Sequence, residues 1–234
     1  MRSSIFLTIF ALCVPVAIGC KSEGNGVTND PANTGAPKPP TTPRSPALLD
    51  PSLATERAPD SFRARFQTSK GPFVVKVTRE WTPNGADRFY NLVRIGYFDG
   101  TKFFRAVDGF MVQFGLNGDP AVNAKWREAP IGDEPVKQGN KRGFMTFAKG
   151  GPNSRTTQVF INYVDNSRLD PMGFPAFGEI VEGMEIVDSL YKGYGEGAPG
   201  GKGPAQGRIQ TEGNAYLTKD FPLLDTVEVA TIVP

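Results

Sequence analysis

The sequence predicts a mainly β domain, an all-β barrel or sandwich with two helices, and three observations support this prediction. Short apolar runs separated by Gly, Pro and Asn recur through residues 61–234, as is typical of many short strands. Only two stretches have helical periodicity, so strands and helices do not alternate as they do in βαβ folds. The 17 Phe, against 2 Trp and 6 Tyr, indicate a core or a pocket built from aromatic rings.

The first elements of the domain are predicted to form a hairpin beginning near Ser61. Phe62, Ala64 and Phe66 alternate with polar residues, which is the period-2 pattern of a half-buried strand. Residues 69–72, with the sequence Ser-Lys-Gly-Pro, are typical of a turn, and residues 73–78 form a second β-rich run.

A helix follows the hairpin. Thr82 is predicted to be its N-cap, with Pro83 at the first helical position and Gly96 as the stop signal. Its apolar face comprises Ala86, Phe89, Leu92 and Val93.

The remaining elements are four short strands, one helix and a closing strand. We expect the strands within 103–107, 110–114, 143–148 and 158–163, the helix over 184–191, and the last strand over 226–233. Between this helix and the last strand, residues 195–200 match the dinucleotide-binding pattern G-x-G-x-x-G. They follow a helix and contain Pro199, so a flexible Gly-rich loop is the better interpretation. The later part of this segment is expected to dock onto the barrel through Ile209, Tyr216, Leu217, Phe221 and Leu223.

The N-terminal residues resemble an export signal. Arg2 precedes an apolar run from Ile5 to Val16, which is shorter than the ~20 residues that a membrane-spanning helix needs. Residues 17–20, Ala-Ile-Gly-Cys, resemble a bacterial lipobox, so we predict that residues 1–19 are a signal peptide cleaved before a lipidated Cys20. An ordinary cleaved signal peptide is the alternative.

Residues 20–60 are predicted to be a disordered tether. They contain eight Pro among Gly, Asn, Thr, Ser and Ala, and cannot bury enough apolar surface to offset the entropy of ordering. We therefore expect an exported, membrane-anchored lipoprotein that faces the periplasm or the cell exterior.

Composition excludes several classes of chemistry. The chain has no His, which removes His-dependent triads and His metal ligands, and its two cysteines, Cys13 and Cys20, both precede the domain. The net charge is +2 and no basic run is present, so no nucleic-acid partner is expected. We expect no metal, no cofactor, a monomer, and a membrane contact through the lipid only.

One segment suggests a binding groove. If residues 103–113 form two strands, Met111 and Gln113 share a face, and Arg105 can join them. By itself the pattern is weak, because Met in a strand usually belongs to the core and Arg is usually solvated.

Three ordered blocks of this chain resemble the cyclophilins, a family of peptidyl-prolyl cis-trans isomerases. The first is residues 103–115, which matches F-H-R-x-x-x-G-F-M-x-Q-x-G at Phe103, Arg105, Gly109, Phe110, Met111, Gln113 and Gly115. The second is 143–161, with Gly151-Pro152-Asn153 and Gln158-Val159-Phe160-Ile161, and the third is 169–184, with Leu169-Asp170, Phe177-Gly178 and Gly183-Met184.

The resemblance implies an eight-stranded antiparallel closed β-barrel capped by two α-helices over residues 61–234, with an insertion at about 192–224 where the family usually has a shorter connection. It also implies catalysis of X-Pro rotation, with Arg105 as the catalytic residue. Together with the export signal, this predicts an enzyme that assists protein folding outside the cytoplasm. The implied substrate-binding residues are Phe110, Met111, Gln113, Ala148, Lys149, Gln158, Phe160, Leu169 and Phe174.

The chain departs from the family pattern at several positions. Phe104 and Phe174 replace two His, Arg168 replaces a frequent Trp, Phe147 replaces a Met, and Lys149 replaces a common Asn. Preference for the residues that flank proline can therefore differ. The alternatives are a proline-peptide-binding chaperone or scaffold module without turnover, which the presence of Arg105 disfavours, and a purely structural lipoprotein.

Overall fold

The computed structural model describes residues 44–234, so the predicted signal peptide, Cys20 and most of the predicted tether lie outside the described residues. Its strands form one antiparallel sheet in the order β3-β4-β6-β5-β7-β2-β1-β8. The strands are β1 (Ser61–Thr68), β2 (Gly71–Thr78), β3 (Arg105–Val107), β4 (Met111–Phe114), β5 (Phe144–Phe147), β6 (Val159–Asn162), β7 (Ala176–Glu182) and β8 (Val227–Val233). The mainly β class is confirmed. Periodicity predicted seven of the eight strands, and the one that it missed is β7.

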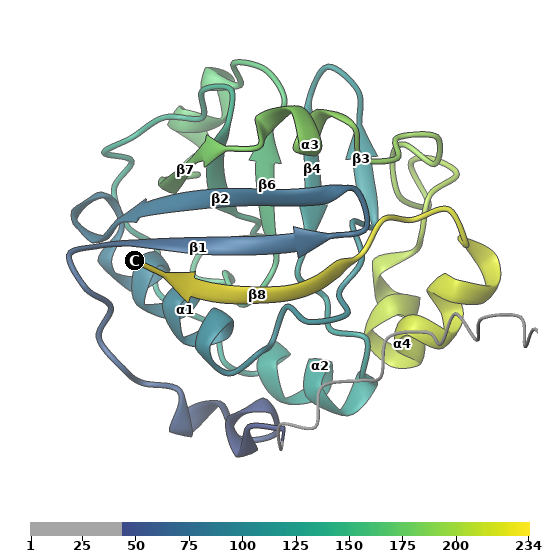
Figure 1. Ribbon diagram of the computed structural model, residues 1–234, viewed down its shortest axis with the longest axis horizontal. Coiled ribbons are helices and arrows are strands. Elements are labelled where there is room, and N and C mark those ends of the chain that lie inside the picture. The colour runs from purple at the N-terminus through teal and green to yellow at the C-terminus, as the bar shows by residue number, and fades with distance from the viewer. Residues whose placement is uncertain (1–43) are drawn as a thin grey trace, which may run out of the picture. The chain divides into compact units, whose positions relative to one another are not determined.

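The sheet curls around a central core, with β1, β2 and β8 crossing in front of β4 and β6 (Figure 1). The prediction of a closed barrel needs correction, because β3 and β8 are the two ends of the sheet and share no ladder. A single bridge between Lys102 and Thr226 joins them just before β3 begins. Beyond the bridge, side chains of β3 and of the residue before it contact the insertion in place of β8, which leaves the seam open.

Aromatic rings fill the interior of the curled sheet. Phe66 of β1 and Phe73 of β2 are paired residues whose rings stack with centroids 5.1 Å apart. Phe66 also contacts Phe89, Phe98 and Phe114, all fully buried. Most of the Phe content therefore serves the core, where each ring removes a large apolar area from water.

The predicted hairpin and first helix are confirmed. In β1 the inward positions are Phe62, Ala64, Phe66 and Thr68, and α1 spans Pro83–Arg94. Thr82 is the N-cap residue by position, but its hydroxyl donates to the Ala176 carbonyl instead of capping the helix. The carboxylate of Glu134 caps the helix instead, since it accepts hydrogen bonds from the N–H groups of Asn84 at 2.7 Å and Gly85 at 3.1 Å.

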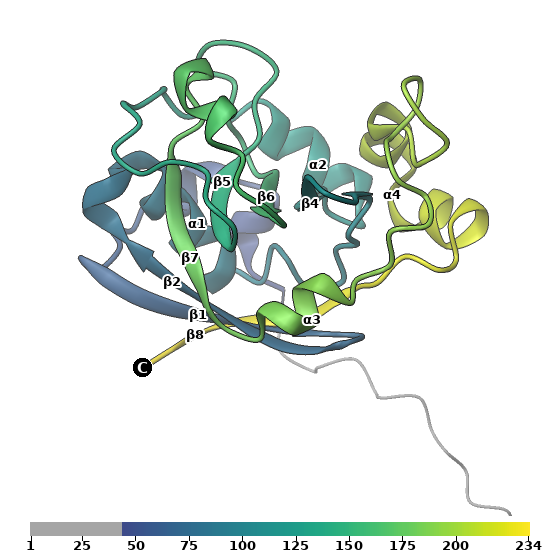
Figure 2. The ribbon, with the colours of Figure 1, turned by 90° about the horizontal axis from the view of Figure 1, so that it is seen from above.

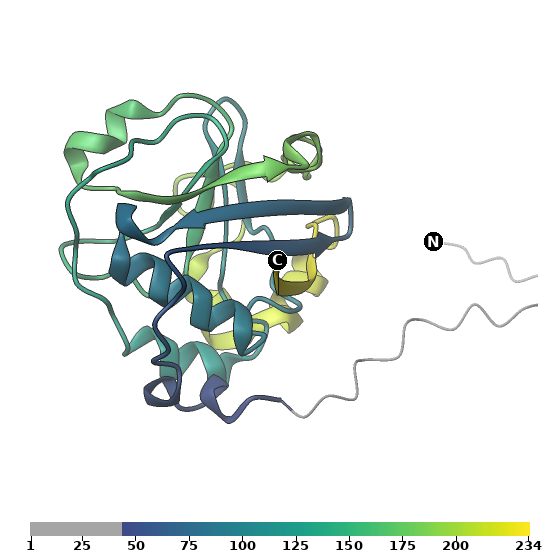
Figure 3. The same cartoon turned by 60° about the vertical axis from the view of Figure 1, so that its left-hand side comes forward.

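The described part of the chain has four α-helices, so the expected pair is an undercount. The predicted second helix is present but short, as α3 (Met184–Asp188), and the additional helices are α2 (Pro120–Arg127) and α4 (Gln206–Asp220). Four 3₁₀ helices lie at Pro46–Leu48, Pro51–Leu53, Arg79–Trp81 and Ser167–Met172. Figure 2 shows α4 beside α2, and Figure 3 shows α1 and α2 on the same side of the sheet.

The domain begins earlier than Ser61, so the tether prediction is wrong for residues 44–60. Leu48 and Ala58 are buried in the main core, and the indole of Trp126 in α2 donates to the Leu48 carbonyl at 3.1 Å. Asn91 of α1 holds the segment as well, because its side chain bonds both backbone groups of Glu56. These few apolar contacts and hydrogen bonds hold a Pro-rich stretch that composition alone assigns to the tether. No helix within residues 44–234 has the length and hydropathy to cross a bilayer.

We expect Leu48→Ala to destabilise the domain by about 2 to 3 kcal/mol, because it removes a buried side chain and leaves a cavity. Leu53, in the same segment, is 60% exposed, so Leu53→Ala should change the free energy of unfolding by less than about 0.5 kcal/mol. Urea unfolding of both variants measures the difference. Equal stabilities would show that residues 44–60 do not belong to the domain.

Candidate active site

Strand register brings three predicted site residues into a row. Arg105 of β3 pairs with Gln113 of β4, and Gln113 pairs with Phe160 of β6. Because paired residues in adjacent antiparallel strands project from the same face, the guanidinium, the amide and the ring lie side by side. The row lies on the outer face of the sheet, since Val112 and Phe114 of the same strand point into the core.

An apolar pocket adjoins this row. Met111, Phe160 and Leu169 form a buried cluster, and Phe174 contacts Phe160 edge-on with ring centroids 6.1 Å apart. The pocket has a volume of about 400 Å³. Its lining comprises all ten predicted residues, Arg105, Phe110, Met111, Gln113, Ala148, Lys149, Gln158, Phe160, Leu169 and Phe174, together with four that were not predicted, Gly150, Ser154, Thr156 and Gln206. The structure thus brings the predicted set together, while the role of each residue stays a prediction.

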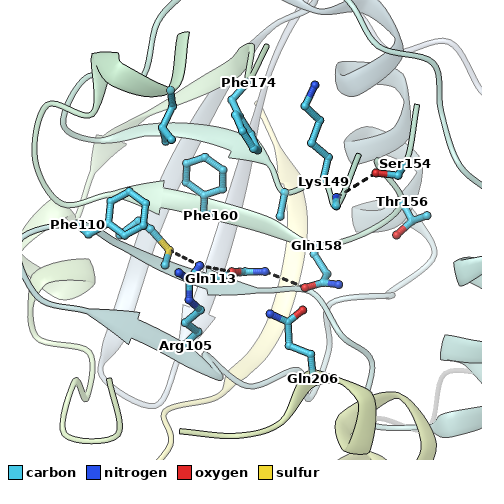
Figure 4. Close-up of a pocket in the computed structure, with 14 residues that line it drawn as sticks. Arg105, Phe110, Gln113, Lys149, Ser154, Thr156, Gln158, Phe160, Phe174 and Gln206 are labelled. Carbon is cyan, nitrogen blue, oxygen red and sulfur yellow. Dashed lines mark hydrogen bonds between the residues drawn. The ribbon is translucent and has the colours of Figure 1, made fainter. Parts of the chain in front are cut away.

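A line of hydrogen bonds crosses the pocket floor (Figure 4). Arg105 Nη1 donates to Gln113 Oε1 at 3.0 Å, and Gln113 Nε2 donates to Gln158 Oε1 at 2.8 Å. Gln113 is only 4% exposed, so these bonds hold its amide in one orientation. The amide nitrogen of Gln158 then remains at the end of the line, where it can donate to a peptide carbonyl.

Arg105 is held from a second side by Glu196. Nε and Nη2 of the guanidinium donate to the two carboxylate oxygens, each at 2.6 Å. These hydrogen bonds hold the pKa of Glu196 below its ordinary value of 4.5, so the carboxylate is ionised at neutral pH. No sequence pattern points to this partner, because Glu196 lies 91 residues from Arg105 in the Gly-rich loop.

The other end of the pocket carries polar groups from the 148–158 segment. The ammonium of Lys149 lies 3.3 Å from Asp133 Oδ2 and 5.4 Å from the centre of the Phe174 ring. Ser154 Oγ accepts from the N–H groups of Gly150 and Gly151, each at 3.0 Å. This bonded turn extends the lining beyond the apolar cluster. Within residues 44–234, no group of three or more Cys, Asp or Glu side chains could hold a metal ion.

The departures from the cyclophilin pattern have different structural roles. Phe104 and Phe147 are both 1% exposed and lie outside the pocket lining. Phe147 packs on Phe177 in the barrel core, and Phe104 belongs to a separate cluster with residues of the insertion. The guanidinium of Arg168 lies 4.6 Å from the centre of the Phe110 ring, so a cation covers this pocket wall.

Comparisons with known proteins agree on the family. The model of the cyclophilin-type peptidyl-prolyl cis-trans isomerase family matches residues 63–210. Peptidyl-prolyl cis-trans isomerase B of Escherichia coli is 34% identical over 145 residues, which cover 58% of this chain and 87% of that protein. The human peptidyl-prolyl cis-trans isomerase-like 3 is 33% identical over 134 residues, 54% of this chain and 80% of that protein.

The fold has solved counterparts. The crystal structure of a Cryptosporidium parvum cyclophilin-type isomerase superposes with a TM-score of 0.56 at 21% identity, covering 74% of this chain and 98% of that one. A second structure of that protein, in the presence of the dipeptide Ala-Pro, gives a TM-score of 0.54. This chain belongs to the cyclophilin family, so the predicted enzyme class, peptidyl-prolyl cis-trans isomerase, is confirmed.

The Arg105–Glu196 pair makes stability depend on pH. A carboxyl group whose pKa is lowered in the folded state contributes stability above its unfolded pKa, and this contribution disappears as the pH falls through the folded value. We therefore expect the melting temperature of the parent chain to exceed that of Glu196→Gln at pH 7. The difference should shrink as the pH falls below 4.5. Thermal unfolding of both proteins between pH 7 and about pH 3 measures it; a difference independent of pH would contradict the ionised pair.

Proposed function

We propose that this chain catalyses rotation of X-Pro bonds in polypeptides by clamping the proline ring in the apolar pocket while Arg105 donates to the prolyl nitrogen. The observation that carries this proposal is the fixed guanidinium at the edge of the pocket formed by Met111, Phe160 and Leu169. The proline ring is apolar and compact, so it suits such a cluster, whereas the peptide bond beside it needs polar partners.

The chemistry needs no nucleophile and no proton relay, in agreement with a chain that lacks His. Rotation about an X-Pro bond has a barrier of roughly 20 kcal/mol, because the twist breaks amide resonance. As the bond twists, the prolyl nitrogen becomes pyramidal and gains a lone pair. A donor placed in advance stabilises that lone pair more than it stabilises the planar ground state, which lowers the barrier.

The groove around the pocket supports a polypeptide as substrate. The side of the pocket away from Arg105 is lined by Lys149, Ser154 and Thr156 (Figure 4). Polar groups here and on Gln158 can bond the backbone of an extended chain. Residues on either side of the proline can thus contribute binding energy.

We expect Arg105→Ala to lower kcat/KM for a short X-Pro peptide about 100-fold, because it removes the donor to the reacting nitrogen. The control is Arg63→Ala, which removes an Arg from an exposed pair on β1, 3.7 Å from Glu182, and should leave activity unchanged. Exchange spectroscopy on the full chain with the peptide measures both rates.

Two results would overturn the proposal in different ways. If the parent chain does not accelerate isomerisation but binds the peptide, the binding-module alternative holds. If Arg105→Ala is as fast as the parent, the enzyme stands but its catalytic residue is wrongly assigned.

We also propose that the enzyme acts outside the cytoplasm as a lipoprotein that assists folding of exported chains. The support is the sequence pattern alone: Arg2, the apolar run from Ile5 to Val16, and the Ala17–Cys20 lipobox. These residues lie outside the described part of the chain. The Pro-rich residues that follow would hold the domain away from the membrane surface.

Mass spectrometry of the mature protein tests this location. We expect an N-terminal Cys20 that carries lipid, and Cys20→Ser should release the domain from the membrane fraction. A mature protein cleaved at another residue, or without lipid, would contradict the anchor.

A further inference from the structure

The Gly-rich loop of the insertion reaches Arg105. Both oxygens of Glu196 accept from the guanidinium at 2.6 Å, on the edge that carries Nε and Nη2. Glu196 is not among the residues that line the pocket, whereas Arg105 is. The carboxylate therefore holds the guanidinium from outside the pocket and does not occupy the place of a substrate.

A count of donors shows what the pair leaves free. A guanidinium has five N–H groups, and four are used: Nε–H and one on Nη2 by Glu196, and the two on Nη1 by Gln113 and by the sulfur of Met111. One N–H on Nη2 remains unbonded. The contact from Nη1 to the Met111 sulfur, at 4.0 Å, is weak because a thioether is a poor acceptor, and Met111 forms the pocket floor, so a substrate can take over this donor. Glu196 thus restricts the orientation of Arg105 without consuming the donors that a substrate needs.

Hydrogen bonds within the loop fix the position of Glu196. The N–H of Gly197 donates to Glu196 Oε1 at 2.9 Å, and the N–H of Gly203 donates to the Glu196 carbonyl at 2.8 Å. A Cβ at residue 201 would lie 2.3 Å from that carbonyl oxygen, and one at residue 203 would lie 2.8 Å from it. Glycine at these positions is therefore required for close backbone approach.

The base of the loop is anchored beside the active site. Tyr194 packs between Tyr191 and Phe221, with ring centroids 5.0 Å from each. The same cluster includes Leu217 and Phe104, the residue directly before Arg105. Phe104, which stands where the family has His, thus provides the apolar surface on which the insertion docks.

We propose that Glu196 is a positioning residue for catalysis, and that the 192–224 insertion is part of the active site through it. The inference rests on the proposed role of Arg105. Two short, charge-assisted bonds on one edge and the Gln113 bond on Nη1 fix the plane of the guanidinium, so the unbonded N–H on Nη2 and the weakly bonded one on Nη1 are placed before the substrate arrives. Through Arg105, Glu196 increases the stabilisation of the twisted transition state and does not affect binding of the proline ring.

The test compares Glu196→Gln with Glu212→Gln in the full chain. Glu212 makes an equivalent two-bond pair with Arg208, at 2.7 and 2.9 Å, in the same insertion but outside the pocket lining. We expect Glu196→Gln to lower kcat about 10- to 100-fold with little change in KM, because a misplaced donor stabilises the transition state less. Glu212→Gln should match the parent.

A second readout does not depend on activity. The Arg105 Nε–H resonance, assigned by its loss in Arg105→Ala, should exchange slowly with water in the parent and in Glu212→Gln, and rapidly in Glu196→Gln. Gly201→Ala, which must displace the Glu196 carbonyl, should reproduce the Glu196→Gln defect, whereas Gly207→Ala has open space and should not.

The outcomes separate this proposal from the proposed function. A parent without isomerase activity overturns both. An active parent with an equally active Glu196→Gln overturns the positioning role alone. A Glu196→Gln variant faster than the parent would instead make the loop an inhibitory contact and also overturn the positioning role.

Discussion

The pairing of β4 with β3 on one side and β6 on the other is the constraint on which the active site depends. All four residues of β4 are buried, which requires that both faces of this strand be covered. Val112 and Phe114 are covered by the aromatic core, and Met111 and Gln113 by the pocket residues. A register shift of one residue would exchange the two faces, so the same apolar packing that stabilises the barrel also directs the amide and the thioether into the pocket.

The open seam of the barrel gives the insertion access to the site. In a closed barrel β3 would pair with β8, but here the two strands are the ends of the sheet. The 192–224 segment lies beside β3 instead, and its apolar residues pack on Phe104. Tyr216, Ile209 and Leu217 dock as the sequence predicts, whereas Leu223 is 58% exposed and its neighbour Leu224 is buried in its place. Phe104, which stands where the family pattern has His, and the long insertion thus pack against each other, and the insertion places a carboxylate beside Arg105.

Prediction from the sequence succeeds where a signal is local. The β1–β2 hairpin, α1 and the 103–114 strand pair follow from alternation, from an N-terminal Pro and from ordered motifs. The helix α2 also has a local signal, since Asp119 caps it and Pro120 begins it, but its weak amphipathicity hides it within a loop. Residues 44–60 and Glu196 have no such signal, because their partners are Trp126, Asn91 and Arg105, which lie far away in the chain.

The sequence by itself determines the mainly β class, the absence of His chemistry and the ten pocket residues, because short-range pattern and ordered family motifs encode them. Only the tertiary structure decides that the barrel seam is open, that the domain begins before Ser61 and that Arg105 is bonded to Glu196. The physical reason is the same in each case. These features come from contacts between segments that are distant in the chain, and side-chain packing and hydrogen-bond geometry are settled only when the segments meet.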